Sequence, residues 1–478
     1  MQLFLPAERK RRRARGRTTA EPLVQQRSAA TVCAGAEKTV AGIGIRMRQA
    51  AKSRTLRALQ YRNFQLFFAG QLISLIGTWM QSVAQSWLVY RMTGSPALLG
   101  LATFAGQIPI FILSPVAGYA ADRLNRRKVV IATQSASMVL ALMLAALTLM
   151  NRVQIWQIFV LASLLGVVNA FDIPARQSFL VEMVGRGDLM NAIALNSSMF
   201  NGARIVGPAI AGILVAKIGE GWCFFANGIS YVAVIWGLLL MKVKAHRPAP
   251  ASMSAWETIR EGFHYVGRTI PIRAIVQLIA IVSFAGMPFT VLMPIFADRI
   301  LHAGAQGLGI LMGTTGAGAL VAALLLASRT GLKGFTRWIP SAAAGFAVSL
   351  AIFAVSRQMW LSCLMLFLAG FAVMLQVGAS NTLIQSMVPD HLRGRAMSVY
   401  SMMYIGVGPI GAAAAGFAAD AFGAPITLVA GAVICLAASG VFAAELPAIR
   451  RVARDLIRKQ ETMGEIPVTE ILDPAPAP

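Results

Sequence analysis

The stretch Gly118-Tyr-Ala-Ala-Asp122-Arg123-Leu-Asn125-Arg126-Arg127-Lys128 is a charged turn between two long apolar runs of the chain. One acid and four bases therefore lie where two apolar helices are joined. Lys and Arg in short loops stay on the cytoplasmic side of a membrane. The turn therefore predicts a membrane protein. If it lies in the cytoplasm, counting the helices assigns every later loop to one side of the membrane.

The composition agrees with a chain that crosses the membrane many times. Hydrophobic residues make up 57% of the 478 residues and charged residues 13%, whereas a soluble chain is about 25% charged. A net charge of +24 would suggest nucleic acid as the partner of a soluble protein. Here the bases fall in loops and tails, so we interpret them through the positive-inside rule and anionic lipid and expect no nucleic-acid partner.

Apolar runs long enough to cross a bilayer recur from Phe64 onward. A helical span needs about 20 predominantly apolar residues. Bases are frequent in the even-numbered turns, such as 123–128 and 329–337, and few in the odd-numbered turns. The positive-inside rule then predicts a multi-pass protein of the inner (plasma) membrane with both termini in the cytoplasm. The twelve predicted spans lie near 64–90, 97–121, 129–150, 155–180, 191–216, 222–241, 274–298, 307–328, 338–356, 360–386, 397–420 and 424–443.

The spans fall into two halves, 63–241 and 274–444, whose sequences repeat at an offset of 204 residues. Leu165-Gly166 in the first half matches Ala369-Gly370 in the second. Two parallel six-helix halves related by an axis along the membrane normal form one known class of transporter, with the substrate path between the halves. The predicted fold is therefore all-α, with twelve transmembrane helices in two pseudo-repeats.

Three further segments flank or join these halves. The basic tail 1–62 is expected to be disordered, and the chain starts either at Met1 or at Met47. The linker 242–273 carries apolar residues at helical spacing between charged ones, which predicts an amphipathic helix on the membrane surface. The tail 445–478 is also predicted to lie in the cytoplasm.

Several motifs resemble those of one transporter family. The charged turn resembles the loop 2–3 signature of the major facilitator superfamily, although Asn125 stands where that signature usually has Gly. Asn tolerates a left-handed turn better than most residues do. Asp172-x-Pro-Ala-Arg176 and Val388-Pro-x-x-x-Arg-Gly-Arg395 resemble the enterobactin-exporter-like branch, also called transmembrane secretion effectors. The resemblance covers about 60–445 and implies the major facilitator fold and transport of a small molecule.

The charged turn also predicts a conformational latch between the two halves. The Asp122 carboxylate could accept hydrogen bonds from free amides at a helix N-terminus, which by the resemblance belongs to the eleventh span. Acids such as Glu182 or Asp390 could pair with the neighbouring arginines. The family implies that such a latch holds the outward-facing state. The alternative is that the turn signals orientation and nothing more. The candidate latch residues are Gly118, Asp122, Arg123, Arg126 and Arg127.

Three charged residues lie well inside predicted spans, away from the span ends, where a charge costs about 2.5–3.5 kcal/mol on insertion scales. Asp172 and Arg176 share one face of the fourth span at i, i+4, and Arg204 lies near the middle of the fifth. One interpretation is a buried structural pair, Asp172–Arg204 or Asp172–Arg176. The other is that Asp172 gains and loses a coupling proton, because burial and a nearby arginine both act on its titration.

Glycine–proline pairs predict bends in the fifth and eleventh spans, since proline removes a helical hydrogen bond. The run 202–212 resembles a reduced form of the superfamily's antiporter motif, and the alternative is a packing face with no bearing on direction. The bend residues are Gly207, Pro208, Gly212, Gly408 and Pro409. Polar and aromatic residues of the spans are candidates for the substrate cavity, although each alone is more often a contact between helices. They are Gln81, Gln85, Gln107, Asn169, Asn196, Asn201, Gln376, Asn381, Tyr400 and Tyr404.

The sequence predicts a secondary transporter that exports an amphipathic small molecule, of the drug or siderophore class, in exchange for protons. No nucleotide-binding loop, catalytic set or metal-ligand spacing is present, so no cofactor, metal or enzyme activity is expected. Uptake or facilitated flux of a metabolite or lipid is the alternative within transport, and a non-transporting membrane sensor or scaffold is the alternative outside it. The expected partners are the substrate and membrane lipid. A monomer is expected, and an outer export partner is left open.

Overall fold

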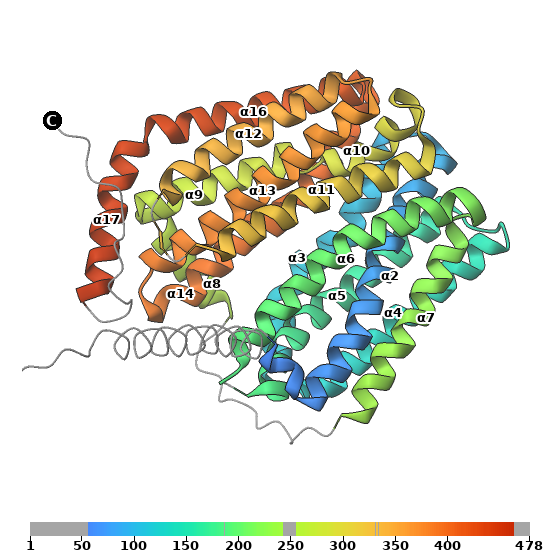
Figure 1. The fold of residues 1–478 in the computed structure, drawn as a ribbon, viewed down its shortest axis with the longest axis horizontal. Coiled ribbons are helices and arrows are strands. Elements are labelled where there is room, and N and C mark those ends of the chain that lie inside the picture. The colour runs from blue at the N-terminus through green and yellow to red at the C-terminus, as the bar shows by residue number, and fades with distance from the viewer. Residues whose placement is uncertain (1–55, 186, 242–254, 330, 333, 463–478) are drawn as a thin grey trace, which may run out of the picture. The chain divides into compact units, whose positions relative to one another are not determined.

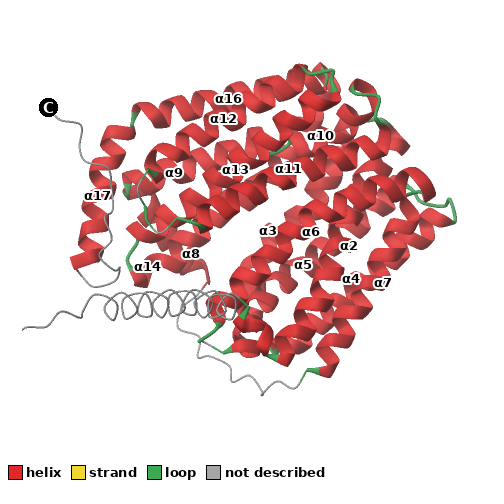
Figure 2. Cartoon of the chain, in the orientation of Figure 1, coloured by secondary structure: helices red, strands yellow, loops and turns green. Residues whose placement is uncertain are grey.

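The computed structural model describes residues 56–462 except 186, 242–254, 330 and 333, and the chain from Ala58 onward forms one compact unit. The described residues form helices and no strand (Figure 2). Twelve of these helical segments are long and apolar enough to cross a membrane, which confirms the predicted fold class. Residues 1–55 of the basic tail, both candidate starts and the first part of the linker lie outside the described residues. The last residues of the tail are described and include a short 3₁₀ helix at Arg57–Gln60.

The first half consists of six long helices, coloured blue to green in Figure 1. Their ends follow local capping rules. Ser95 accepts a hydrogen bond from the Leu98 amide at the start of the second helix, and Asn125 accepts one from the Lys128 amide at the start of the third. Asn125 has φ of −66°, so this turn needs no left-handed residue there. The helices are α2 (Arg62–Thr93), α3 (Pro96–Arg123), α4 (Arg126–Leu149), α5 (Ile155–Val184), α6 (Leu189–Ile218) and α7 (Glu220–Leu240).

The second half also has six spans, and two of them contain π-helical turns. The seventh span comprises α9 (Ile270–Ile281), π-turns at Val282–Gly286 and Phe296–Ile300, and α10 (Phe289–Ile295). The eleventh comprises α14 (Asp390–Ser401), a π-turn at Met402–Gly406, and α15 (Val407–Phe422). Such turns occur often at functional sites. The remaining spans are α11 (Gly304–Ala327), α12 (Phe335–Val355), α13 (Met359–Met387) and α16 (Ala424–Ala444).

The two halves repeat the same helix contacts. A Cβ atom on Gly166 of α5 would lie 2.3 Å from the carbonyl oxygen of Gly106 on α3. A Cβ atom on Gly370 of α13 would lie 2.0 Å from the carbonyl oxygen of Thr315 on α11. Only glycine allows backbones to approach so closely. The contact between the fourth and second spans is therefore repeated between the tenth and eighth, and its two glycines are separated by the offset of 204 residues that the sequence predicts.

The halves meet through two equivalent helix pairs, α3 with α15 and α6 with α11. Glycines line both contacts. A Cβ atom on Gly100 would lie 2.4 Å from the carbonyl oxygen of Ala412, and one on Gly309 would lie 2.6 Å from that of Pro208. The predicted bend residue Gly212 lies in the second contact, where a Cβ atom would lie 3.0 Å from Gly309 Cα. Close backbone packing therefore holds the halves together along these pairs.

Two amphipathic helices lie outside the spans. The predicted linker helix is α8 (Ala255–Arg268), which packs on α14 and buries Val266. A second, α17 (Leu446–Thr462), forms in a segment for which the sequence predicts only a tail. Its residues Ile449, Ala453 and Ile457 follow one another at i, i+4 spacing on one face of the helix, and all three are fully buried. This spacing, flanked by arginines, is the signal that could have predicted the helix.

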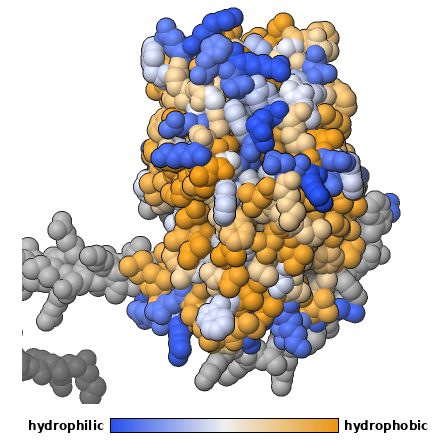
Figure 3. Space-filling model, turned by 90° about the vertical axis from the view of Figure 1, so that its right-hand side faces the viewer, coloured by the Kyte–Doolittle hydropathy of each residue, from blue (hydrophilic) through white to orange (hydrophobic). Residues whose placement is uncertain are grey.

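The outer surface suits a lipid environment. Trp236, Val355 and Phe422 are each more than 60% exposed, and exposed apolar area on this scale marks contact with membrane or partners. Figure 3 shows a broad apolar area across the lower middle of one face, with hydrophilic residues gathered above and below it. The chain is a multi-pass membrane protein.

Candidate transport pathway

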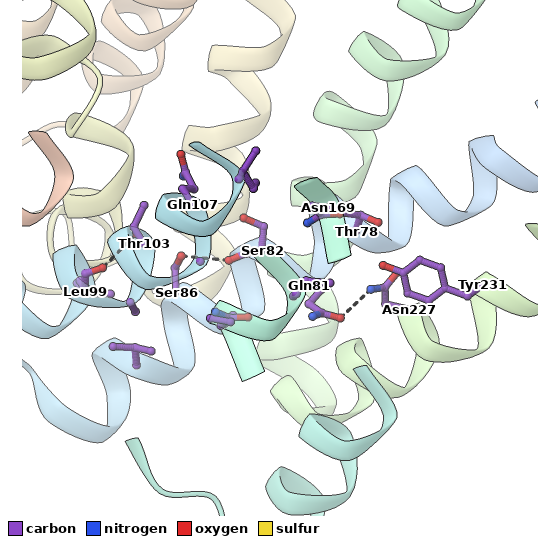
Figure 4. A pocket seen from close by; sticks show the side chains of 17 residues that line it. Thr78, Gln81, Ser82, Ser86, Leu99, Thr103, Gln107, Asn169, Asn227 and Tyr231 are labelled. Atoms are coloured by element: carbon purple, nitrogen blue, oxygen red, sulfur yellow. Dashed lines mark hydrogen bonds between the residues drawn. The ribbon is translucent and has the colours of Figure 1, made fainter. Parts of the chain in front are cut away.

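A polar cavity of about 240 Å³ lies inside the first half, between α2, α3, α5 and α7 (Figure 4). Four predicted cavity residues line it, namely Gln81, Gln85, Gln107 and Asn169. The Asn227 amide of α7 donates a 2.7 Å hydrogen bond to Gln81 Oε1. Its lining contains amide and hydroxyl groups and no acid. The cavity can therefore solvate the polar parts of a small molecule without imposing a charge.

A second cavity, of about 200 Å³, lies between the two halves. Thr103 and Gln107 of α3 line both cavities, so the two adjoin. On the other side the lining includes Tyr404 and the predicted bend residue Gly408. Ser283 donates a 2.6 Å hydrogen bond to the carbonyl oxygen of Tyr404, which joins the π-turns of the seventh and eleventh spans. The π-turns therefore shape the wall of the cavity between the halves.

Tyr404 is a fifth predicted cavity residue that lines a cavity, and the remaining five line neither. Tyr400 is buried, and its hydroxyl donates a 2.8 Å hydrogen bond to the Val377 carbonyl oxygen of α13. Asn201 donates to the Ser197 carbonyl oxygen of its own helix, and Asn381 accepts from Gln385 one turn further on. Asn196 lies half-buried on α6, and Gln376 is fully buried in the second half. Thr78, Asn227 and Tyr231 line the first cavity but are not among the sequence candidates.

Asp172 lies inside the first half in a complete set of polar contacts. Its side chain is nearly buried, and one carboxylate oxygen accepts hydrogen bonds from Thr133 Oγ1 at 2.8 Å and Gln134 Nε2 at 3.0 Å. The other oxygen lies 3.2 Å from Arg176 Nε. Of the two pairings that the sequence leaves open, the structure contains Asp172–Arg176. These three donors contact both carboxylate oxygens of Asp172.

Arg204 occupies a different environment on α6. Its guanidinium lies over the ring of Trp79 on α2, with 5.7 Å between the guanidinium carbon and the ring centroid. Trp79 in turn makes an edge-to-face contact with Phe200 at 5.6 Å. The guanidinium therefore lies against an aromatic pair of the first half, and Arg204 is not among the residues that line either cavity.

The predicted bend in α6 sits directly beside Arg204. Pro208 lies inside the helix and has no amide proton, so the carbonyl oxygen of Arg204 lacks its usual helical donor. That oxygen would lie 3.0 Å from a Cβ atom on Gly316 of α11. Gly207 packs against α2, because a Cβ atom there would lie 2.5 Å from Trp79 Cβ. In the eleventh span, Pro409 follows the π-turn by three residues and is buried.

Two of the predicted latch residues, Arg126 and Arg127, contact groups of their own half. Arg126 Nη1 lies 2.9 Å from Glu182 Oε1, one of the two acids suggested for it. Arg127 donates to the carbonyl oxygens of Leu238 at 2.8 Å and Leu239 at 2.9 Å, which cap the end of α7. Of the remaining members, Arg123 is exposed at the end of α3. A Cβ atom on Gly118 would meet no described atom within 4 Å. The side chain of Asp122 lies outside the described part. Asp390, the other suggested acid, pairs with Arg393 on its own helix.

The molecule has two ends that differ in how the halves meet. We call the described turns at 124–125, 187–188, 331–332 and 388–389 the basic end, and the turns at 94–95, 150–154, 219, 301–303, 356–358 and 423 the opposite end. At the opposite end, Tyr90 Oη donates a 2.7 Å hydrogen bond to Asp298 Oδ2 across the halves. Arg299 donates to the Gly94 carbonyl oxygen at 3.1 Å, and Ser95 donates to Asp420 at 3.2 Å. Side chains from both halves therefore close the opposite end.

Comparison with known proteins places these features in one family. A family model described as transmembrane secretion effector matches residues 53–477. The staphyloferrin A transporter of Staphylococcus aureus is 24% identical over 358 residues, which are 75% of this chain and 89% of the relative. The multidrug efflux pump Tap of Mycolicibacterium fortuitum is 27% identical over 384 residues, 78% of this chain and 93% of the pump.

Solved structures show the same fold at low sequence identity. A bacterial homologue of the human lysosomal transporter Spinster, in an inward-facing and unoccupied conformation, aligns with a TM-score of 0.59 and 16% identity over 83% of this chain and 97% of that one. A POT family transporter in complex with 5-aminolevulinic acid aligns with a TM-score of 0.66 and 10% identity over 81% and 97%. At these identities the likeness concerns the arrangement of helices alone.

Proposed function

Because the chain belongs to the transmembrane secretion effector family of the major facilitator superfamily, we propose that it exports an amphipathic small molecule of the drug or siderophore class. It is a secondary transporter rather than an enzyme, as its relatives are. The observation that carries the proposal is the pair of adjoining cavities, one inside the first half and one between the halves. Their amide, hydroxyl and apolar linings suit a molecule with both polar and apolar parts.

The proposed mechanism is alternating access between the two ends. The positive-inside rule assigns the basic end and both termini to the cytoplasm, in the plasma membrane. The hydrogen bonds from Tyr90 and Arg299 across the opposite end support a state closed to the outside. Near the basic end, a Cβ atom on Gly118 would meet no atom of the described residues within 4 Å. The second state would close the basic end around the charged turn, where Asp122 would act as the latch.

Proton exchange is proposed to act through the Asp172–Arg176 pair. Among the described residues, Asp172 is the acid that lies deep within a span and is nearly buried. Protonation would remove its charge and release Arg176, which would change how α4 and α5 hold one another. We also propose that the monomer is the unit of transport.

Purified protein in proteoliposomes tests the proposal directly. An imposed pH gradient should drive movement of fluorescent dyes and siderophores from a panel that includes anionic, neutral and cationic members. Asp172→Asn should abolish gradient-driven movement but retain exchange of substrate across the membrane without a gradient. The absence of flux for every compound in the wild-type protein would favour a sensor or scaffold, and full gradient-driven flux in Asp172→Asn would remove the coupling role.

A further inference from the structure

We propose that Arg204 binds an oxyanion of the transported molecule, so that the preferred substrate is an amphipathic anion such as a carboxylate. The inference rests on the proposed transport function and names the class of substrate. A charged side chain inside a span costs about 2.5–3.5 kcal/mol on insertion scales, and such residues normally have a partner or line a cavity. Arg204 lies at the centre of α6, so its charge requires an explanation.

Arg204 differs from three other arginines of the first half, each of which pairs with an acid. Arg91 pairs with Glu220 at 2.8 Å, Arg126 with Glu182 at 2.9 Å, and Arg176 with Asp172 at 3.2 Å. Among the residues that the structure describes, no carboxylate forms an ion pair with Arg204. Its guanidinium instead lies over the face of the Trp79 ring. A ring face offsets part of a cation's desolvation cost, but it does not supply the charge that an acid would.

Arg204 lies on α6, one of the helices along which the halves meet. Its guanidinium lies over the Trp79 ring of α2, and Arg204 itself lines neither of the two cavities. The helix backbone at this point packs against Gly316 of α11, so Arg204 lies at the joint along which the halves meet. A molecule in the second cavity that reached toward α6 would meet a guanidinium whose hydrogen-bond donors are not taken by an acid.

The chemistry of guanidinium selects an oxyanion. Its planar set of donors matches a carboxylate or phosphate in a two-point contact. An interior of low dielectric strengthens that contact relative to the same pair in water. Two sources could supply the oxyanion, the transported molecule or the headgroup of an anionic lipid entering between the halves. Met287 and Ile405 in the second cavity offer apolar contact to the body of an amphipathic anion, which favours the transported molecule.

Three pyrene compounds of one size test the proposal by binding. 1-Pyrenebutyrate is anionic, 1-pyrenebutanol is neutral and 1-pyrenebutylamine is cationic, and each accepts energy from tryptophan. Binding is measured on the purified full chain in nanodiscs of phosphatidylcholine. The wild-type protein should bind the butyrate about 10-fold to 100-fold more tightly than the butanol, the range expected for a hydrogen bond to a charged group. Arg204→Gln should remove the preference, Arg204→Lys should retain part of it, and Arg91→Gln should leave it unchanged.

The possible outcomes separate the alternatives. Equal binding of the three compounds by the wild-type protein, no binding of any, or an unchanged preference in Arg204→Gln overturns the proposal. If nanodiscs containing phosphatidylglycerol weaken butyrate binding to the wild-type protein alone, the oxyanion belongs to lipid and the substrate assignment is wrong. Flux of the panel without any preference for anions leaves the transport function standing and removes this inference. Anion-selective binding that depends on Arg204 but occurs without flux would leave this inference standing and contradict the proposed transport function.

Discussion

Asp172 and Gln376 occupy equivalent positions in the two halves, yet the structure satisfies the polar atoms of only one of them. Asp172 has three partners within 3.2 Å. Gln376 is fully buried, and neither its amide nitrogen nor its amide oxygen has a hydrogen-bond partner among the described residues. The equivalent of Arg176 is Ser380, whose buried hydroxyl also has none. The repeat therefore preserves two polar positions on the fourth and tenth spans but stabilises only the first-half pair.

Substitution at these two positions should change stability in opposite directions. Asp172→Asn removes the charge that balances Arg176 and should lower stability by about 1–3 kcal/mol, the cost of leaving a buried polar group unsatisfied. Gln376→Leu removes two unsatisfied groups at similar size and should be neutral or stabilising. Thermal unfolding of both variants in one detergent measures the difference. A drop for Gln376→Leu as large as that for Asp172→Asn would contradict it.

Loss of a hydrogen bond across the opposite end should shift the balance between conformations. Tyr90→Phe removes the donor to Asp298 and should raise the population open at that end by about 10-fold or more, because a bond to a charged acceptor contributes about 1.5–3 kcal/mol. Spin labels at Met150 and Gln358, one in each half, measure the change as a longer distance, in a background without the four native cysteines.

Arg91→Gln is the matched control for Tyr90→Phe. Arg91 also lies near the opposite end, but its partner Glu220 belongs to the same half. This variant should leave the distance distribution as it is in the parent protein. An equal shift of the distance in both variants would mean that the opposite end opens whenever a local side-chain contact is lost, and not because the contact between the halves is removed.

The sequence predicts the number, order and repeat of the spans, because hydropathy and loop charge depend on composition within short windows. It does not predict the π-turn at Met402–Gly406, which arises from packing against the seventh span. It also cannot tell which face of a span a polar residue occupies. Gln81 lines a cavity and Gln376 is buried in a helix bundle, although both are glutamines in apolar helices. Tyr231 is missed because the predicted cavity omits the sixth span, α7, on which it lies.

Arg127 should stabilise the first half without influencing the balance between conformations. Its guanidinium caps the last carbonyl groups of α7, at Leu238 and Leu239. Arg127→Gln should therefore lower stability by about 1–2 kcal/mol and leave spin-label distances between the halves unchanged. Arg127→Lys, which keeps the charge but not the two-point contact, should lie between. A change in the inter-half distance would instead assign Arg127 to the latch.

Asp122 is the latch residue for which a charge-removing change is most informative. Asp122→Asn keeps the size of the side chain and removes the charge that would favour a helix N-terminus. Transport in proteoliposomes should be lost, while expression, folding and membrane topology persist. Arg126→Gln is the comparison, because its partner Glu182 lies within the first half. Unchanged transport in Asp122→Asn would mean that the turn serves orientation alone.

Two glycines of α3 should trap the protein in opposite states. Gly100 faces α15 so closely that a Cβ atom would lie 2.4 Å from the Ala412 carbonyl oxygen, so Gly100→Val is incompatible with the closed opposite end. Gly118, more than four turns away on the same helix, has open space around it in this state. If the alternative conformation closes the basic end at Gly118, the valine side chain of Gly118→Val should fit the conformation with the closed opposite end and clash in the alternative one.

The two variants give a paired measurement with spin labels at both ends. Gly100→Val should lengthen the distance between Met150 and Gln358 and shorten the distance at the basic end. Gly118→Val should leave only the distances of the conformation with the closed opposite end. Both should lose transport, since alternating access needs both states. Gly118→Ala is the milder control and should retain more activity than Gly118→Val, because a single methyl group is easier to accommodate. Normal transport by Gly118→Val would show that α3 meets no neighbour at its basic end in either state.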